Sequence, residues 1–137
     1  MPTIDANMTS NTLTLQLLSE TFAIHSLAPE STIPPEAFSA PIYFIAKTYD
    51  EVSLVLPQAI TLDSEDVEKD WRALEVVGPL GFSLTGILSR ISSILAAEKI
   101  SIFAISTFDT DYILVKDNLI NKAIDALGHN NYSIIRD

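Results

Sequence analysis

The sequence predicts an α+β protein made of two related strand-and-helix units, of which the first is degenerate. In the second half of the chain, apolar residues recur three and four positions apart from Leu84 to Leu95 and again from Leu119 to Leu127. This spacing is typical of two amphipathic helices. Runs of β-branched and aromatic residues predict four strands around them, at 71–77, 100–107, 112–115 and 132–135. The resulting order, strand-helix-strand-strand-helix-strand, predicts a ferredoxin-like antiparallel sheet with both helices on one face.

A weak internal repeat relates the two halves of the chain. When the sequence is shifted by 59 residues, three short blocks coincide: 13–18 with 72–77, 48–50 with 107–109, and 54–56 with 113–115. One constant offset that matches three blocks favours two copies of one unit. The first copy lacks the long helix, because Pro29, Pro34 and Pro35 interrupt the region where it would form.

The repeat also predicts how the chain is divided. The first copy is expected to contain four short strands, at 13–17, 22–27, 42–47 and 52–56. Ser19 and Glu20 predict a turn between the first two of these strands. The predicted division is a flexible tail at 1–11, a first unit at 12–62, an acidic linker at 63–70 and a second unit at 71–137.

The acidic run at 63–70 has two interpretations, a solvated linker and a metal site. It carries five acids and one lysine, and it has no glycine. Calcium-binding loops need a turn glycine and oxygen ligands at alternate positions, so the linker is favoured.

The composition restricts the classes of partner. The formal net charge is −10, from 18 acids and 8 bases, which opposes binding to nucleic acid or to an anionic membrane because both would repel the chain. Cysteine is absent, which excludes disulfides and thiolate chemistry. No apolar run approaches the roughly 18–20 residues that span a bilayer, and the first eleven residues lack a signal-peptide pattern. We therefore expect a cytoplasmic protein without cofactor or metal.

The sequence offers little for catalysis. His25 and His129 are the only histidines; His25 lies in a predicted strand, and His129 follows a predicted helix-ending glycine at 128. Neither is expected to act, and no phosphate loop, dinucleotide fingerprint or HExxH motif is present. We predict a protein that is not an enzyme and has no catalytic residues.

A candidate ligand site is predicted where the first long helix begins. Ser83 can cap that helix, and the free amides at the start of the helix suit a carboxylate. Gly81 allows a ligand to approach the backbone closely. Asp109 and Asp111 lie in the turn between the two following strands, where either can hold an ammonium group. Hydroxyl groups and an aromatic wall would come from Thr85, Thr107, Thr110 and Phe108. The pattern suits a zwitterionic amino acid, but the spacing alone favours a plain turn, a helix cap and a solvated hairpin.

The runs GPLGFSLTG and ISTFDTDYILV resemble the ACT domain, a small ligand-binding βαββαβ module, and in particular short tandem-ACT proteins related to the CASTOR arginine sensors. The resemblance implies a regulatory amino-acid sensor that binds its ligand at an ACT–ACT interface, forms a homodimer and acts on a client protein that the sequence does not reveal. It also implies the ligand-contacting positions, which are Gly81, Phe82, Ser83, Thr85, Gly86, Thr107, Phe108 and Asp111, with Asp109 and Thr110 beside them.

One departure from the family pattern leaves the ligand open. Position 84 is Leu84, where the arginine sensors resemble this chain less closely and carry an acidic residue. The identity of the ligand therefore does not transfer. Two alternatives stay open: a structural or adaptor ACT protein that mediates oligomerisation without a ligand, and a small enzyme that would have to use Asp109 and Asp111.

Overall fold

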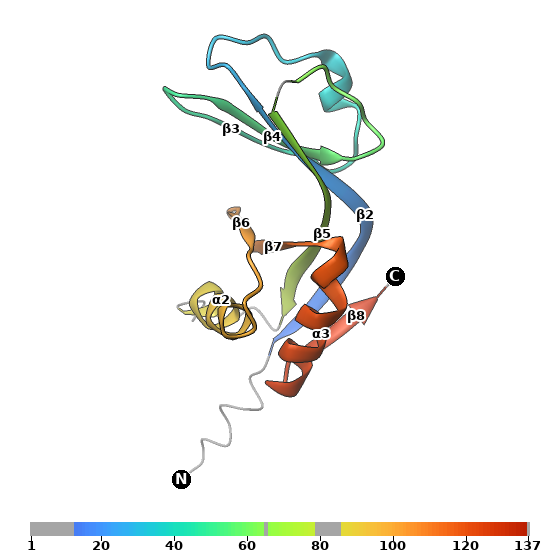
Figure 1. Cartoon of the computed structure of the whole chain (residues 1–137), viewed down its shortest axis with the longest axis vertical. Helices are drawn as coiled ribbons and strands as arrows, with labels where there is room; N and C mark the ends of the chain where they lie inside the picture. Colours follow the sequence, from blue (N-terminus) through green and yellow to red (C-terminus); the bar gives the residue numbers. More distant parts are fainter. Residues whose placement is uncertain (1–12, 65, 79–85, 137) are drawn as a thin grey trace. The chain divides into compact units, whose positions relative to one another are not determined.

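The computed structural model describes residues 13–64, 66–78 and 86–136 of the 137-residue chain (Figure 1). The chain forms two compact units, which do not follow one another in sequence. Unit 1 combines the chain up to Ser19 with Arg72 onward, and unit 2 is Glu20–Trp71. Two strands, β2 (Thr14–Leu27) and β5 (Asp66–Gly78), each supply residues to both units. Residues 13–19 thus lie in the same unit as the C-terminal half, whereas the expected division grouped them with the first copy.

Unit 1 contains the predicted order of elements. After β5 come α2 (Ile87–Ala97), β6 (Phe103–Ser106), β7 (Asp111–Lys116), the 3-10 turn η2 (Asp117–Leu119), α3 (Ile120–His129) and β8 (Ser133–Arg136). The hydrogen-bonded neighbours in its sheet are β6, β7, β5, β2 and β8 in that order. The β6–β7 pair is antiparallel, but β8 pairs in parallel with β2, from Thr14 opposite Ser133 to Leu17 opposite Arg136. The last described strand therefore lies beside the first described strand.

The two helices in the described part of unit 1 form because their apolar faces share one core. In α2 the buried residues Ile91 and Leu95 are four positions apart, and α3 buries Ile120, Ala123 and Leu127 at the same helical spacing. These faces contact one another and the strands. Each fully buried large aliphatic side chain stabilises the fold by about 1.5–3 kcal/mol. The buried residues of this core are Leu13, Leu15, Leu17, Leu74, Val76, Ile91, Leu95, Ile100, Ile113, Val115, Ile120, Ala123, Leu127 and Tyr132.

The helix ends differ from the prediction. The first residue of α2 is Ile87, after Gly86 in the left-handed conformation with φ 84°, and the predicted cap Ser83 lies outside the described residues. The prediction that Gly128 ends the second helix is wrong. Helix α3 continues to His129, and Asn131 takes the left-handed conformation instead, with φ 72°. A short polar side chain such as Asn tolerates this conformation better than most residues do.

Unit 2 contains the second part of β2, a single 3-10 turn η1 (Pro35–Phe38), β3 (Phe44–Lys47), β4 (Val52–Pro57) and the first residues of β5. Strand β4 pairs antiparallel with both β2 and β3. The one helical turn begins with proline at its first position, where the missing N–H costs nothing. A core cluster of unit 2 contains Ala37, Val52, Leu54 and Leu56, packed against Leu27, Ile33, Ile60 and Leu62.

Two predictions about loops are wrong. Strand β2 runs without interruption through Ser19 and Glu20, where a turn was expected. Strand β5 begins at Asp66, so most of the predicted acidic linker is strand, although its first five residues are exposed. Asp70 holds this strand to the preceding loop: its N–H donates to the Gln58 side-chain oxygen (2.6 Å), and its carboxylate accepts from the Gln58 amide (3.0 Å).

The internal repeat is confirmed for the two hairpins. Strands β3 and β4 begin at 44 and 52, and β6 and β7 begin 59 residues later, at 103 and 111. Their registers also agree, because Phe44 pairs with Val55 and Phe103 with Leu114 at the same offset. Two weakly similar local sequences therefore form hairpins with the same register, one in each unit.

Candidate functional site

The turn between β6 and β7 is built by one threonine. Thr107 N–H donates to the Thr110 carbonyl (2.8 Å), and Thr107 Oγ1 accepts from the backbone N–H groups of Asp109 and Thr110 (3.2 Å each). Such side-chain bonds fix a tight turn. The next residue, Phe108, is left fully exposed at the tip.

The turn borders a pocket of about 230 Å³ in unit 1. A short hydrogen bond from Thr110 Oγ1 to the Val76 carbonyl (2.6 Å) holds the turn against the end of β5. The lining also includes Ile87, the first residue of α2. The hairpin turn, the strand end and the helix start thus meet at one place, lined by Val76, Ile87, Thr107, Phe108, Asp109, Thr110 and Asp111.

The described lining of this pocket is acidic. It contains the side chains of Asp109 and Asp111 and no Lys, Arg or His. Asp111 accepts a hydrogen bond from Ser106, its cross-strand partner, which orients one carboxylate oxygen. Carboxylates in a partly enclosed site form charge-assisted hydrogen bonds with cationic donors. The pocket is therefore suited to an ammonium group.

Tyr112, the residue after Asp111, adds a neutral hydroxyl beside this acidic region. Burial raises the pKa of Tyr112, and the charge and hydrogen bond of Glu75 and the charge of Asp109 raise it further. Its hydroxyl donates to Glu75 (3.3 Å) and stays protonated near neutral pH. Tyr112 does not line the pocket itself.

Half of the predicted site residues are brought together here. Thr107, Phe108, Asp109, Thr110 and Asp111 all line the pocket. Gly86 lies next to the lining residue Ile87 but is not itself part of the lining. The other predicted contacts, Gly81, Phe82, Ser83 and Thr85, lie outside the described residues.

Sequence reasoning missed the two apolar lining residues. Val76 and Ile87 were assigned only to a strand and a helix, because their side chains are apolar and have no charged or hydrogen-bonding group. The available signal was their position in the sequence, since Val76 precedes and Ile87 follows the predicted contacts at 81–86.

Elsewhere in unit 1, a groove of about 490 Å³ lies between α2 and α3 and is lined by Ser93, Ile94, Ala97, Glu98, Ala126, His129 and Asn130. His129 Nδ1 donates to the Asp125 carbonyl (2.7 Å) within its own helix. Among the described residues, no cluster of three or more His, Cys, Asp or Glu is arranged to hold a metal ion. The helices in the described ranges are all too short or too polar to cross a bilayer.

Comparison with known proteins places part of the chain in a family. Residues 66–128, from the start of β5 into α3, match the family model of the ACT domain. This chain belongs to the ACT-domain family. The match includes the whole β6–β7 hairpin and the described pocket, so the site lies within the ACT domain.

A curated protein and a solved structure are also similar to this chain. The cytosolic arginine sensor for mTORC1 subunit 1 of Mus musculus is 41% identical over 102 residues, which cover 72% of this chain and 30% of that protein. The chain spans about a third of the length of the curated relatives it matches. Protein Atu0741 of Agrobacterium tumefaciens has a crystal structure with a TM-score of 0.86 and 30% identity, covering 92% of this chain and 94% of that one.

A solved structure of lower sequence identity has a similar fold. The regulatory subunit of aspartate kinase from Thermus thermophilus has a TM-score of 0.60 at 12% identity, covering 85% of this chain and 96% of that chain. At this identity the similarity concerns the fold alone. The described part of the chain thus has the mixed α/β architecture of regulatory ACT domains, with two helices and a largely antiparallel sheet in that part.

Proposed function

We propose that this chain is a regulatory protein without catalytic activity that binds an amino acid at the β6–β7 hairpin. The observation that carries the proposal is the pocket where two aspartates of the hairpin turn face the first turn of an ACT helix. The arginine-sensor name of a 41% identical relative supports an amino acid as the class of ligand.

In this proposal the two ends of the zwitterion are recognised by different groups. Asp111, assisted by Asp109, holds the ammonium group, and Thr107 and Thr110 border it. The carboxylate would be held by the free amides at the start of α2, which favour an anion, together with the predicted contacts at 81–86 that precede this helix in sequence. The ligand itself stays open, because Leu84 replaces an acidic residue of the arginine sensors.

We further propose that the two units are tandem ferredoxin-like ACT units and that a second ACT unit completes the site. Phe108 supports this, because its side chain lines the pocket and is nevertheless fully exposed. An aromatic ring in that position has no packing role in the described unit and is suited to an interface. A homodimer would supply such a surface.

The mechanism would be linkage between ligand and assembly. A ligand that binds better to the closed interface shifts the equilibrium toward it, and a client protein in the cytoplasm would detect that change. The shift can be no larger than the difference in the ligand's affinity for the two states.

A thermal-shift screen with the twenty common amino acids tests the function. A ligand at a hundred times its dissociation constant stabilises the folded protein by about 2.7 kcal/mol, which raises the melting temperature by several degrees. We expect one amino acid or a small related group to do so. If none raises the melting temperature while the protein assembles as a dimer, the sensor proposal fails and the ligand-free adaptor is favoured.

A further inference from the structure

Strand β3 of unit 2 has an exposed edge. It stands at one end of the order of hydrogen-bonded strands, and among the described strands it pairs only with β4. Three of its four residues, Ile45, Ala46 and Lys47, are exposed. Proteins commonly block such an edge with lysine, but the only lysine of β3, Lys47, donates to the Pro29 carbonyl of its own unit. In the described part of the chain this edge is therefore open to pairing with another extended segment.

The core of unit 2 continues into apolar side chains along this edge. Ile45 is directly opposite the buried Leu54, so the two side chains lie on the same face of the sheet, yet Ile45 is 36% exposed. Tyr43, just before β3, and Phe38, at the end of η1, are 37% and 48% exposed, and their rings meet edge to face at 5.6 Å. We call Phe38, Tyr43 and Ile45 the apolar margin. A strand added to β3 would cover it.

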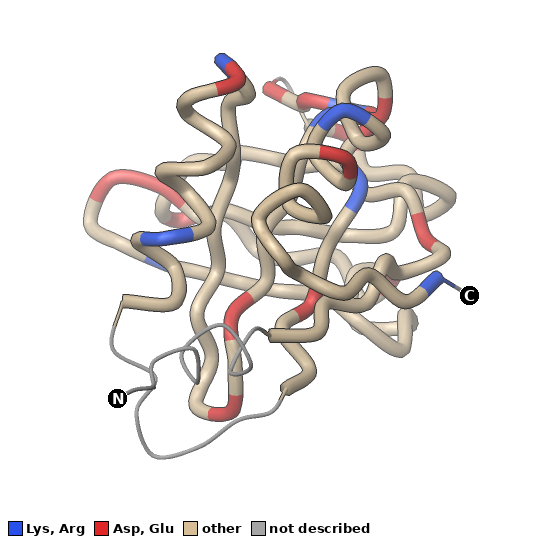
Figure 2. Tube along the Cα trace, turned by 90° about the horizontal axis from the view of Figure 1, so that it is seen from below, with Lys and Arg blue, Asp and Glu red and all other residues tan. Residues whose placement is uncertain are grey.

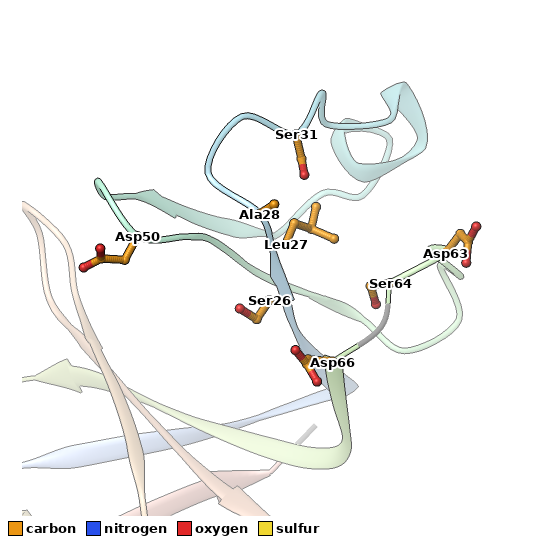
Figure 3. Close-up of a pocket in the computed structure, with 8 residues that line it drawn as sticks. All are labelled: Ser26, Leu27, Ala28, Ser31, Asp50, Asp63, Ser64 and Asp66. Carbon is orange, nitrogen blue, oxygen red and sulfur yellow. The ribbon is translucent and has the colours of Figure 1, made fainter.

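The charge of unit 2 decides which class of partner fits this edge. Residues 20–71 hold ten of the 18 acids and two of the eight bases, so their net charge is −8 out of −10 for the chain. Acidic positions outnumber basic ones along the described chain in Figure 2. The exposed acids Glu36 and Asp50 flank the apolar margin in sequence. Figure 3, which shows a pocket of about 470 Å³ in unit 2, has the Asp50 carboxylate pointing away from the β3–β4 hairpin.

This charge favours a basic partner over a second copy of the chain. Two copies joined edge to edge at β3 would bring together two units of net charge −8, which costs free energy. A segment with lysine or arginine is attracted instead, and a cation over the exposed rings of the apolar margin adds a cation–π contact. By the internal repeat, β6 is the equivalent edge strand of unit 1. The net charge outside residues 20–71 is only −2, so a contact between copies in unit 1 meets much less repulsion.

We propose that the β3 edge binds a basic, extended segment of another protein, which adds to the sheet as a strand. The backbone N–H and C=O groups at the edge hold the segment, and alternate apolar side chains cover the apolar margin. Its lysine or arginine side chains are attracted by the acids of unit 2, among them Glu36 and Asp50. This surface belongs to unit 2, and its binding does not depend on the amino-acid site in unit 1.

Fluorescence anisotropy with short labelled peptides and the full chain tests the proposal. The first peptide alternates lysine with valine, and the second has glutamate in place of lysine. The third has the lysine sequence with alternate backbone nitrogens methylated, which keeps the charge and removes N–H donors. We expect the first peptide to bind and the other two to bind at least about tenfold more weakly. Equal binding of the lysine peptide and its methylated form would show attraction by net charge alone and would overturn the proposal, as would no binding of the lysine peptide.

Two matched variants locate the surface. Ile45 and Val67 are strand residues of unit 2 that are 36% and 37% exposed, and β4 and β2 lie between their strands in the sheet. Ile45→Ser should weaken binding of the lysine peptide about tenfold, and Val67→Ser should weaken it less than about threefold. Equal losses would contradict a surface at β3. Analytical ultracentrifugation of both variants tests the second copy, because dimerisation lost in Ile45→Ser alone would make the edge a contact between copies and overturn the proposal.

Amide hydrogen exchange gives a readout that does not depend on affinity. The lysine peptide should slow exchange of the backbone amides in β3, because an added strand takes them out of contact with water. Exchange in β6, the equivalent edge strand of unit 1, should stay unchanged. Equal protection of β3 and β6, or binding without protection of β3, would contradict strand addition at this edge.

Discussion

Single threonines fix the two hairpin turns of this protein. In unit 2, Thr48 Oγ1 accepts from the N–H groups of Asp50 (3.1 Å) and Glu51 (3.2 Å), which repeats the bonds of Thr107 in unit 1. Each turn also leaves an aromatic residue, Tyr49 or Phe108, fully exposed at its tip. The threonines therefore set the position of both tips.

Replacing either threonine by valine keeps the shape and removes the hydroxyl. Because one side-chain acceptor is lost for two backbone donors, Thr48→Val and Thr107→Val should each lower the free energy of unfolding by about 0.5–1.5 kcal/mol. Urea denaturation measures this. Thr61→Val is the control at an exposed position and should change stability by less than about 0.5 kcal/mol. Equal effects in all three variants would contradict the role of the turn bonds.

We expect the protein to lose stability in mild acid because of His25. Burial lowers the pKa of His25 below its usual value of 6.5, and the nearby charge of Lys69 lowers it further. The unfolded chain therefore binds this proton more readily than the folded chain does. Neutral His25 makes its full contribution to the free energy of unfolding above pH 6.5. This contribution declines as the pH falls through 6.5 toward the lower pKa of His25 in the folded state, by at most about 1.4 kcal/mol per pH unit.

Urea denaturation between pH 7.5 and pH 5.5 measures this decline. His25→Asn is the comparison, because the amide can keep the bond to Ser64 but does not titrate. The variant should lose less stability than the wild type over this range. Parallel pH profiles for the two proteins would mean that other groups are responsible.

At the scale of helices, two glycines are expected to respond in opposite ways to alanine. Gly86 precedes α2 with φ 84°, a conformation that costs an alanine about 1–2 kcal/mol. Gly128 lies inside α3, where a Cβ would meet no atom within 4 Å. Thermal or urea denaturation should show Gly86→Ala destabilised by that amount and Gly128→Ala stabilised by about 0.5–1 kcal/mol. Equal signs for the two variants would contradict these backbone assignments.

The apolar face of α2 supplies a test of the core. Leu95 is fully buried, and Leu95→Ala should lower the free energy of unfolding by about 2–5 kcal/mol. Ser89→Ala, on the exposed side of the same helix, should change it by less than about 0.5 kcal/mol. Trp71 fluorescence during urea denaturation reports both values. A small effect of Leu95→Ala would mean that the helix does not share the core of unit 1.

The elements that the sequence predicted well are those encoded by local pattern. Both helices of the second half and both hairpins follow from helical spacing, alternation and turn chemistry. The turn expected at Ser19 and Glu20 fails because pairing partners far along the chain keep β2 extended. The same tertiary pairing makes strand out of the polar residues from Asp66, against their low strand propensity.

At the scale of the whole molecule, the division of the chain into units could not be predicted from the sequence. The repeat predicts two consecutive copies, whereas unit 2 is inserted within unit 1 because β2 and β5 each run through both. No local pattern encodes which distant strand pairs with which. The hairpin half of the ligand site was predictable, because Thr107 to Asp111 are adjacent in sequence. The pocket of unit 2 that Ser26 and Asp66 line was not predictable, because these two residues come together only in the fold.

The central claim is that Asp111 holds an amino acid at the hairpin pocket, and isothermal titration tests it most directly. The titrant is whichever amino acid the thermal-shift screen identifies. Asp111→Asn keeps the shape and removes the charge, so it should weaken binding roughly ten- to a hundredfold. Asp125→Asn, which removes an exposed acid of α3 outside the pocket, should leave the affinity unchanged. Equal affinities for the wild type and Asp111→Asn would contradict the claim and would make Asp111 a structural residue of the hairpin.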